Sequence, residues 1–221
     1  MYFLTGTSKL VNRSSIPAGV SKAAAISLLH DHDFFFQCEP HYVSHRALPS
    51  SSSSSFPSSS SPNTTTISGG SATTAYQIPR DVQPVGDPAV RVYEVVDHVP
   101  NPVWSSSVVS TEEFVDLADG LWVRIRSPLA VVMETRWTIR ERREDGKGRG
   151  GGEEEREGEG ELELVEDVTI SCSKLLMGIV KSQVDSNWRE IHRRIAARLV
   201  EDARKEREAG KAGRGEGEGK E

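Results

Sequence analysis

Residues 175–199 read LLMGIVKSQVDSNWREIHRRIAARL, and their apolar side chains recur every three or four positions. This spacing places them along one face of an α-helix of roughly 30 residues, which would be about 45 Å long. Because the helix directly follows several segments with β-strand patterns, we expect a curved antiparallel sheet that closes over one long helix. The expected apolar face consists of Leu176, Val180, Val184, Trp188, Ile191, Ile195 and Leu199.

The preceding strands are predicted from alternating apolar side chains. The clearest case is the strand at 131–140, where Met133, Trp137 and Ile139 share one face. Asp119-Gly120 is a two-residue turn signal between strands. The predicted fold class is α+β, with about seven antiparallel strands wrapped on the long C-terminal helix and two short helices after the first strand. The other strands are expected at 2–13, 42–48, 90–96, 105–114, 121–126 and 162–172, and the short helices at 23–29 and around 34–36.

The composition predicts one domain with two insertions and a tail. Only 36% of the 221 residues are hydrophobic, and the deficit is concentrated in three tracts rich in Ser, Gly, Glu or Lys. Without these tracts roughly 160–170 residues of ordinary composition remain, which is enough for one sizeable core. We therefore expect a single domain over 1–206, interrupted by disordered insertions at about 49–75 and 144–160, and a disordered charged tail at 207–221.

The charge and the cysteine content argue against several classes of protein. A net charge of −6 is unlike that of a nucleic-acid binder, which carries a positive surface. The two cysteines, Cys38 and Cys172, cannot build a disulfide framework, and the first residues lack the charged-then-apolar pattern of a secretory signal. No window approaches 18 apolar residues, so no integral membrane association is expected. These features predict a cytoplasmic protein, with the nucleus as the open alternative.

Three segments carry a resemblance to a known superfamily. They are Leu29-His30-Asp31-His32-Asp33 with Pro40; Ser127-Pro128-Leu129 with Met133 and Trp137; and Val165-Glu166-Asp167-Val168 through Cys172 into the helix that carries His192. With the element order, they resemble the START and polyketide-cyclase-like (SRPBCC) superfamily of helix-grip folds. The closer resemblance is to a fungal domain-of-unknown-function family, over about 14–48, 76–142 and 161–200. The chain departs from that pattern at its two insertions and at Glu39, where Asn is expected.

The resemblance implies a cavity between a seven-stranded sheet and the long helix. Across the superfamily such a cavity accommodates apolar small molecules, although several branches have lost or filled it. The resemblance therefore implies a hydrophobic small molecule as the partner and does not specify which one.

One cluster has a spacing that a metal site would also show: His30, His32, Cys38, His41 and His45. A structural zinc site draws paired ligands from two separate segments, whereas these side chains straddle a helix end, a proline and a strand. We interpret them as helix-end and surface residues and expect no metal. The sequence also contains no nucleophile elbow, Gly-rich phosphate loop or Ser/His/Asp arrangement, so it predicts no catalytic residue and no cofactor.

Two carboxylates and one histidine are candidates for contact with a ligand. Glu94 and Glu166 each lie in phase with the apolar side chains of a strand, so both are expected to point inward, where burial raises a carboxyl pKa. The alternative is a β-bulge that turns each one outward. His192 flanks the apolar face of the long helix and is either a ligand contact or a packing residue. The predicted ligand-binding residues are Met133, Trp137, Ile139, Leu164, Glu166, Val168, Trp188, His192 and Glu94.

Three functions remain open at this point. The favoured one is binding of an apolar or amphipathic small molecule, lipid-like or polyketide-like, in an internal cavity. The second is an enzyme on the same fold, a cyclase, hydrolase or isomerase that uses Glu94, Glu166 or His192 as acid or base. The third is a structural or interaction protein whose core is filled. The oligomeric state is not predicted.

Overall fold

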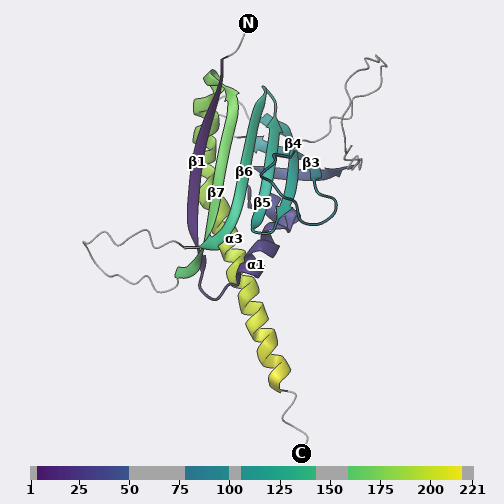
Figure 1. Ribbon diagram of the computed structural model, residues 1–221, viewed down its shortest axis with the longest axis vertical. Coiled ribbons are helices and arrows are strands. Elements are labelled where there is room, and N and C mark those ends of the chain that lie inside the picture. The colour runs from purple at the N-terminus through teal and green to yellow at the C-terminus, as the bar shows by residue number, and fades with distance from the viewer. Residues whose placement is uncertain (1–3, 50–77, 100–105, 143–158, 216–221) are drawn as a thin grey trace, which may run out of the picture.

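The computed structural model describes residues 4–49, 78–99, 106–142 and 159–215. Within these ranges seven strands form one antiparallel sheet in the order β1-β7-β6-β5-β4-β3-β2 (Figure 1). Strands β2 to β7 follow one another across the sheet, and β1 pairs with β7 at its edge. The strands are β1 Thr5–Pro17, β2 Tyr42–Leu48, β3 Arg91–Val99, β4 Ser106–Leu117, β5 Gly120–Ser127, β6 Val131–Glu141 and β7 Glu159–Ser173.

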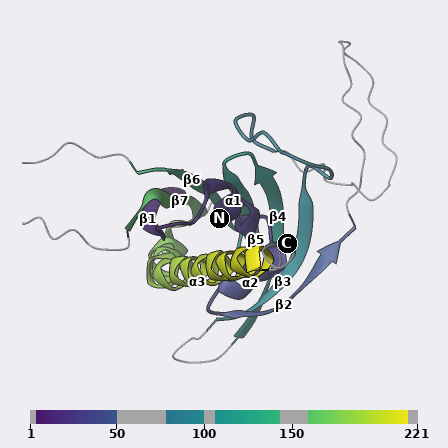
Figure 2. The same cartoon turned by 90° about the horizontal axis from the view of Figure 1, so that it is seen from below.

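The described helices lie against the inner face of the sheet, which curves around them (Figure 2). They are α1 Lys22–Leu29, α2 His32–Cys38 and α3 Lys174–Gly215. Side-chain oxygens cap the two short helices: Ser21 Oγ accepts a hydrogen bond of 3.1 Å from the Ala24 N–H, and Asp31 Oδ1 accepts one of 3.1 Å from the Phe34 N–H. Such caps satisfy backbone donors that a helix leaves free at its start. The predicted helix-grip α+β fold is confirmed.

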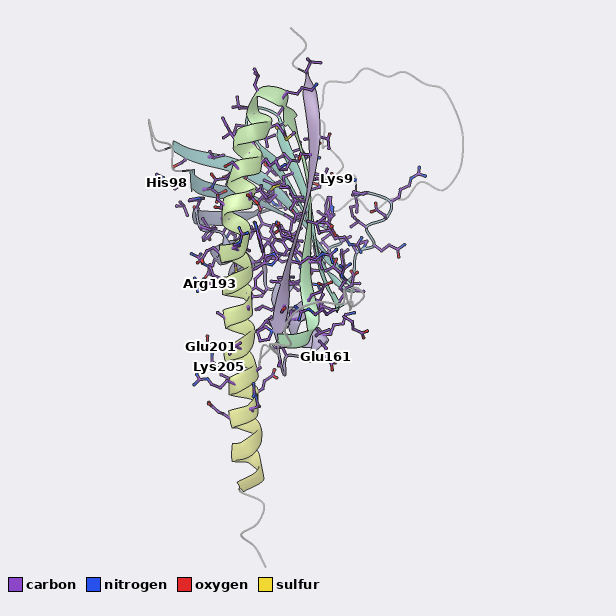
Figure 3. The ribbon with its side chains drawn as sticks, turned by 90° about the vertical axis from the view of Figure 1, so that its left-hand side faces the viewer. Lys9, His98, Glu161, Arg193, Glu201 and Lys205 are labelled. Carbon is purple, nitrogen blue, oxygen red and sulfur yellow. The ribbon has the colours of Figure 1, made fainter. Side chains whose placement is uncertain are left out.

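The apolar face of α3 packs on the sheet as predicted. The first half of α3 joins an apolar cluster around Val168 of β7, and the second half joins the main core through Ile195. The polar side of the helix is turned away from the sheet, as Arg193, Glu201 and Lys205 show in Figure 3. None of the helices in the described ranges is both long enough and apolar enough to span a membrane.

The long helix extends further than the sequence suggested. It ends at Gly215, so residues 207–215, expected in a disordered tail, are helical instead. This end of α3 projects beyond the sheet (Figure 1), and ion pairs four residues apart, such as Lys205 with Glu201, each stabilise an exposed helix by about 0.2–0.5 kcal/mol. The expected insertions at 49–75 and 144–160 lie outside the described residues, except for residues 49, 159 and 160.

The sheet buries side chains on both of its faces. The inner face carries the main core, with Phe114, Leu121 and Trp137 beneath α1 and α2. On the outer face Val115 and Trp122 are buried in a second cluster with side chains of the segment 78–90. The buried outer face matters for the site. Because both faces are buried, an apolar side chain in a strand can point to either face, so alternation alone does not identify the inner one.

The turn between β4 and β5 differs from the prediction by one residue. The sequence predicts a turn at Asp119-Gly120, whereas the turn consists of Ala118 and Asp119, and Gly120 is the first residue of β5. A Cβ added to Gly120 would lie 1.9 Å from the backbone oxygen of Trp137. Glycine is required here because the backbone of β6 approaches too closely for any side chain.

Candidate functional site

A buried group of polar side chains lies where α3 crosses β1 and β7. Asn12 of β1 and Glu166 of β7 are direct partners across the two strands, and Asn12 Nδ2 donates a hydrogen bond of 2.8 Å to Glu166 Oε2. Ser14 of β1 forms a hydrogen bond of 2.8 Å with His192 Nδ1 of α3. We call Asn12, Ser14, Glu166 and His192 the polar quartet. Its members come from the first strand, the last strand and the last helix of the described chain.

His192 is the least satisfied member of the polar quartet. Its side chain is almost completely buried, with 2% of the residue exposed. Nε2 lies 3.4 Å from Glu166 Oε2, and no hydrogen bond to Nε2 is formed by the described residues. The imidazole is framed by two tryptophans, with ring centroids 5.3 Å away for Trp137 and 5.2 Å away for Trp188. The arrangement is a buried acid and imidazole between aromatic walls.

The structure brings together four of the predicted ligand-binding residues: Trp137, Glu166, Trp188 and His192. The other inner-face residues lie nearby in two different surroundings. Two of them are fully enclosed in the main core, and two belong to the apolar cluster under the first half of α3. The former are Ile139 and Leu164, and the latter are Met133 and Val168.

Glu94 does not point inward, and that expectation is corrected. Its side chain is 34% exposed and accepts two hydrogen bonds from Arg46, of 2.7 and 2.9 Å. The Arg46 guanidinium lowers the pKa of the Glu94 carboxyl, where burial was expected to raise it. The cause is that β3 is buried on both faces, since Val92 beside Glu94 and Val95 on the inner face are both buried. Glu94 is therefore in phase with the apolar side chains of the outer face, not with those of the inner face.

Three inner carboxyls were missed by the sequence reasoning: Glu39 at the end of α2, Asp97 of β3 and Glu112 of β4. Glu39 accepts a hydrogen bond of 2.9 Å from Asn187 Nδ2 of α3, and Glu112 accepts one of 3.2 Å from Ser110 Oγ. Asp97 Oδ1 is buried and without a hydrogen-bond partner among the described residues. Together with Glu166 we call these side chains the carboxyl cluster.

Burial raises the pKa of the three missed carboxyls into the neutral range. The pKa of Glu39 rises to about 7, first through burial and then through the charge of Asp97, while the hydrogen bond from Asn187 opposes the rise. The charge of Glu166 also contributes to the raised pKa of Glu39. Burial raises the pKa of Glu112 to about 8, with further contributions from Asp97 and Glu39, and it raises the pKa of Asp97 to about 6. The strand register places Asp97, Glu112 and Glu166 on the inner face of the sheet, and the charges of Asp97 and Glu166 both act on Glu39.

The residues of the candidate metal cluster have partners of other kinds. His32 binds the Tyr93 hydroxyl at 2.9 Å through Nδ1 and Asp116 Oδ1 at 2.8 Å through Nε2. His45 binds the Asp33 carboxylate at 3.0 Å. Burial raises the pKa of the Cys38 thiol to about 12, so this sulfur stays protonated at neutral pH. Within the described ranges, no three His, Cys, Asp or Glu side chains are arranged to hold a metal ion.

Two surface hollows stand out among the described residues, and neither lies between the sheet and α3. One is on the outer face beside Arg80 and Arg126, and the other is beside Val200 near the projecting end of α3. The enclosed cavity expected from the sequence is not one of these hollows. On the inner face, however, Ile125 and Met133 of the central strands are only half-buried. Solvent therefore reaches part of this face.

The comparison with protein families gives a match over most of the chain. A family model described as a domain of unknown function (DUF7053) matches residues 5–201. The chain belongs to the DUF7053 family. No curated protein matches the sequence. The predicted membership in a domain-of-unknown-function family is confirmed, and the family description specifies no activity.

Solved structures with the same fold come from biosynthetic proteins. One is the di-domain ARO/CYC StfQ from the steffimycin biosynthetic pathway, with a TM-score of 0.52 and 12% identity over 89% of this chain and 52% of that one. Another is the di-domain ARO/CYC BexL from the BE-7585A biosynthetic pathway, with a TM-score of 0.52 and 9% identity over 86% and 49%. The DUF7053 chain spans about half the length of each. At these identities the likeness shows a shared fold and no more.

Proposed function

We propose that this protein binds an apolar or amphipathic small molecule between the inner face of its sheet and α3. One observation carries the proposal: His192 Nε2 is buried and forms no hydrogen bond with any described residue, although Glu166 Oε2 lies only 3.4 Å away. An unpaired buried polar atom costs about 1–3 kcal/mol, so native proteins rarely keep one without a reason. A ligand group that bonds to both His192 and Glu166 would satisfy them.

The surroundings of the polar quartet suit the apolar part of such a ligand. Trp137 and Trp188 flank His192 at ring-centroid distances of 5.3 and 5.2 Å. Met133 of β6 and Val184 of α3 are half-buried members of the neighbouring apolar cluster, so they have surface left to cover. Small-molecule sites typically combine such apolar and aromatic walls with a few polar groups that orient the ligand.

A second candidate function is catalysis, and a specific contact favours it. Glu166 and His192 are two titratable groups that converge at one buried position, which is the minimum for an acid–base pair. On this proposal the protein moves a proton on a bound substrate, as a cyclase, hydrolase or isomerase does. The two similar solved structures described above are named as ARO/CYC proteins from biosynthetic pathways, and this likeness supports the second candidate.

The proposal is tested by ligand binding to the full chain. Native mass spectrometry of the purified protein would identify small molecules that co-purify, and thermal shift would be measured with fatty acids, sterols and aromatic polyketides. A ligand at a hundredfold excess over its Kd adds about 2.7 kcal/mol of stability. Met133→Trp should fill the space and abolish the shift. Val109→Trp is the matched control, because Val109 is exposed on β4 and a tryptophan there leaves the inner face unchanged.

The possible outcomes separate the three functions. A co-purifying or stabilising ligand that Met133→Trp loses and Val109→Trp retains supports binding. Turnover of that ligand, lost in both Glu166→Gln and His192→Gln while binding persists, supports catalysis. If no compound binds and Met133→Trp is as destabilising as an overpacked core substitution, about 1–3 kcal/mol, the inner face is filled and the protein has a structural or interaction role.

A further inference from the structure

The carboxyl cluster places acids on the inner face that are costly to ionise there, as the raised pKa values of Glu39, Asp97 and Glu112 show. Its members come from four separate parts of the fold: Glu39 from the residue that follows α2, Asp97 from β3, Glu112 from β4 and Glu166 from β7. Glu112 is 7% exposed and Glu166 is 5% exposed. Burying a carboxylate is costly unless a cation or several hydrogen bonds compensate for the lost water.

The compensation within the described residues comes from neutral groups. Glu39 receives an amide hydrogen bond from Asn187, and Glu166 receives one from Asn12. Glu112 receives only the Ser110 hydroxyl, and Asp97 Oδ1 receives nothing. These interactions satisfy polar atoms, but they supply no positive charge that would favour the ionised form of the acids.

The one described cation whose charge acts on Glu39 is committed to other partners. Arg194 of α3 lowers the pKa of Glu39, against the larger effect of burial. Its guanidinium donates hydrogen bonds to the Glu190 carboxylate at 2.7 Å and to the Gln37 carbonyl at 2.9 Å. Arg194 therefore bonds outside the cluster, and a cation that would neutralise the cluster has to be supplied from elsewhere.

A second, independent observation concerns His192, which lies beside Glu166 of the cluster. His192 Nε2 is buried, has no hydrogen-bond partner among the described residues and lies 3.4 Å from Glu166 Oε2 of the cluster. In the tautomer that donates Nδ1–H to Ser14 Oγ, Nε2 is a bare acceptor. In that tautomer Nε2 and the Glu166 carboxylate are two acceptors that face each other, and a donor group of a ligand would satisfy both.

We propose, on the basis of the proposed function, that the ligand is an amphipathic amine whose protonated nitrogen is held by the carboxyl cluster and His192. The ammonium group supplies both the positive charge and the N–H donors that these side chains lack. Its apolar part lies along Met133 and the other half-buried inner-face residues. A metal ion fits less well, because no three of the described acids, histidines or cysteines are arranged to hold one.

The test compares three probes that differ only in the polar end: octylamine, octanol and octanoate. Binding of each to the full chain would be measured by calorimetry at pH 6 and pH 8. We expect octylamine to bind at least tenfold more tightly than octanol at pH 8, and octanoate to bind least. The preference for octylamine should weaken at pH 6, because Glu39 and Glu112, whose pKa values are about 7 and 8, are then protonated and neutral.

Isosteric variants test which carboxyls contribute to octylamine binding. Glu39→Gln and Glu112→Gln should each reduce octylamine affinity at pH 8 at least tenfold while octanol affinity stays within twofold. Glu94→Gln removes a carboxylate of the same type from the opposite face of the sheet, where it pairs with Arg46, so it should change neither affinity. The thermal midpoint of each variant verifies folding, and Glu39, which is only half-buried, keeps the test available if Glu112→Gln does not fold.

Two other outcomes are decisive. If octanol or octanoate binds as tightly as octylamine, the ligand is not an amine, whereas the proposed binding function stands. If none of the three probes binds, and no fatty acid, sterol or aromatic polyketide binds either, the proposed function itself is overturned. Displacement of octylamine by millimolar Mg²⁺ or Ca²⁺ would assign the cluster to a metal ion and overturn the amine proposal.

Discussion

Glu112→Gln should stabilise this protein at alkaline pH. Glu112 is 7% exposed, its one hydrogen-bond partner among the described residues is the neutral Ser110 hydroxyl at 3.2 Å, and burial raises its pKa to about 8. Glutamine keeps the shape of the side chain and still accepts the Ser110 hydrogen bond, but it carries no charge at any pH. The substitution therefore isolates the cost of ionising one buried carboxyl.

The sign and size of the effect follow from linkage. The folded state holds the Glu112 proton up to about pH 8, whereas an unfolded chain loses it near pH 4.3. Between these values the folded state binds more protons, so the contribution of Glu112 to wild-type stability is complete below about pH 4, falls as pH rises from about 4 to about 8 and then levels off. The difference between the folded-state and unfolded-state pKa values corresponds to roughly 5 kcal/mol of stability for this one group. Glu39 and Asp97, whose pKa values are also raised, add to the decline in the same direction.

The assay is urea unfolding of the wild-type protein and of Glu112→Gln between pH 5 and pH 9. At pH 5 the two should agree within about 1 kcal/mol, the range of a mild substitution, and at pH 9 the variant should be more stable by several kcal/mol. Glu94→Gln is the control and should give no gain at pH 9, because it loses an exposed ion pair. A wild-type stability that is flat or rises from pH 5 to pH 8, or a variant that is weaker at pH 9, would refute the reasoning.

Two further predictions concern the fold. Gly120→Ala should destabilise the protein by more than about 3 kcal/mol or prevent folding, since its Cβ would meet the Trp137 backbone oxygen at 1.9 Å; a thermal midpoint within a few degrees of wild type would show that the two strands can separate. Ile195→Ala should cost about 2–5 kcal/mol in denaturant unfolding because Ile195 is 2% exposed, whereas Ile179→Ala on the same helix, at 70% exposure, should stay within about 0.5 kcal/mol. Equal costs for the two would mean that α3 presents a different face to the sheet.

The fold was predictable because its main signals are local and repeated. The apolar face of α3 recurs over seven positions, and the alternation in 131–139 leaves one orientation for β6. The C-terminal end of α3 was missed for the opposite reason. Residues 207–215 are polar and rich in glycine, so nothing in their pattern separates an exposed helix from a tail. The outer-face cover by 78–90 was also missed, because its cluster with Val115 and Trp122 joins segments far apart in the chain.

The site was predictable only where one strand or helix carried the signal. Glu166 and His192 stand in phase with the apolar residues of β7 and α3, so their inward positions could be inferred. Asp97 and Glu112 belong to different strands, and nothing in either strand indicates that their charges affect one another. One local signal did exist, since Glu39 replaces an expected Asn before Pro40. Its meaning depended on Asn187, which is 148 positions away in the sequence.

The carboxyl cluster also bears on the choice between a binding site and a filled core. A core selected for stability alone has no use for buried acids with neutral partners, because well-packed apolar residues in such places are often equally or more stable. The raised pKa values of Glu39, Asp97 and Glu112 describe that cost. Groups that lower stability while facing an inner surface are typical of sites that act on a ligand, where function and stability compete. Stabilisation by Glu112→Gln at pH 9 together with loss of octylamine binding would therefore have one cause: the charge that weakens the empty protein is the charge that the ligand neutralises.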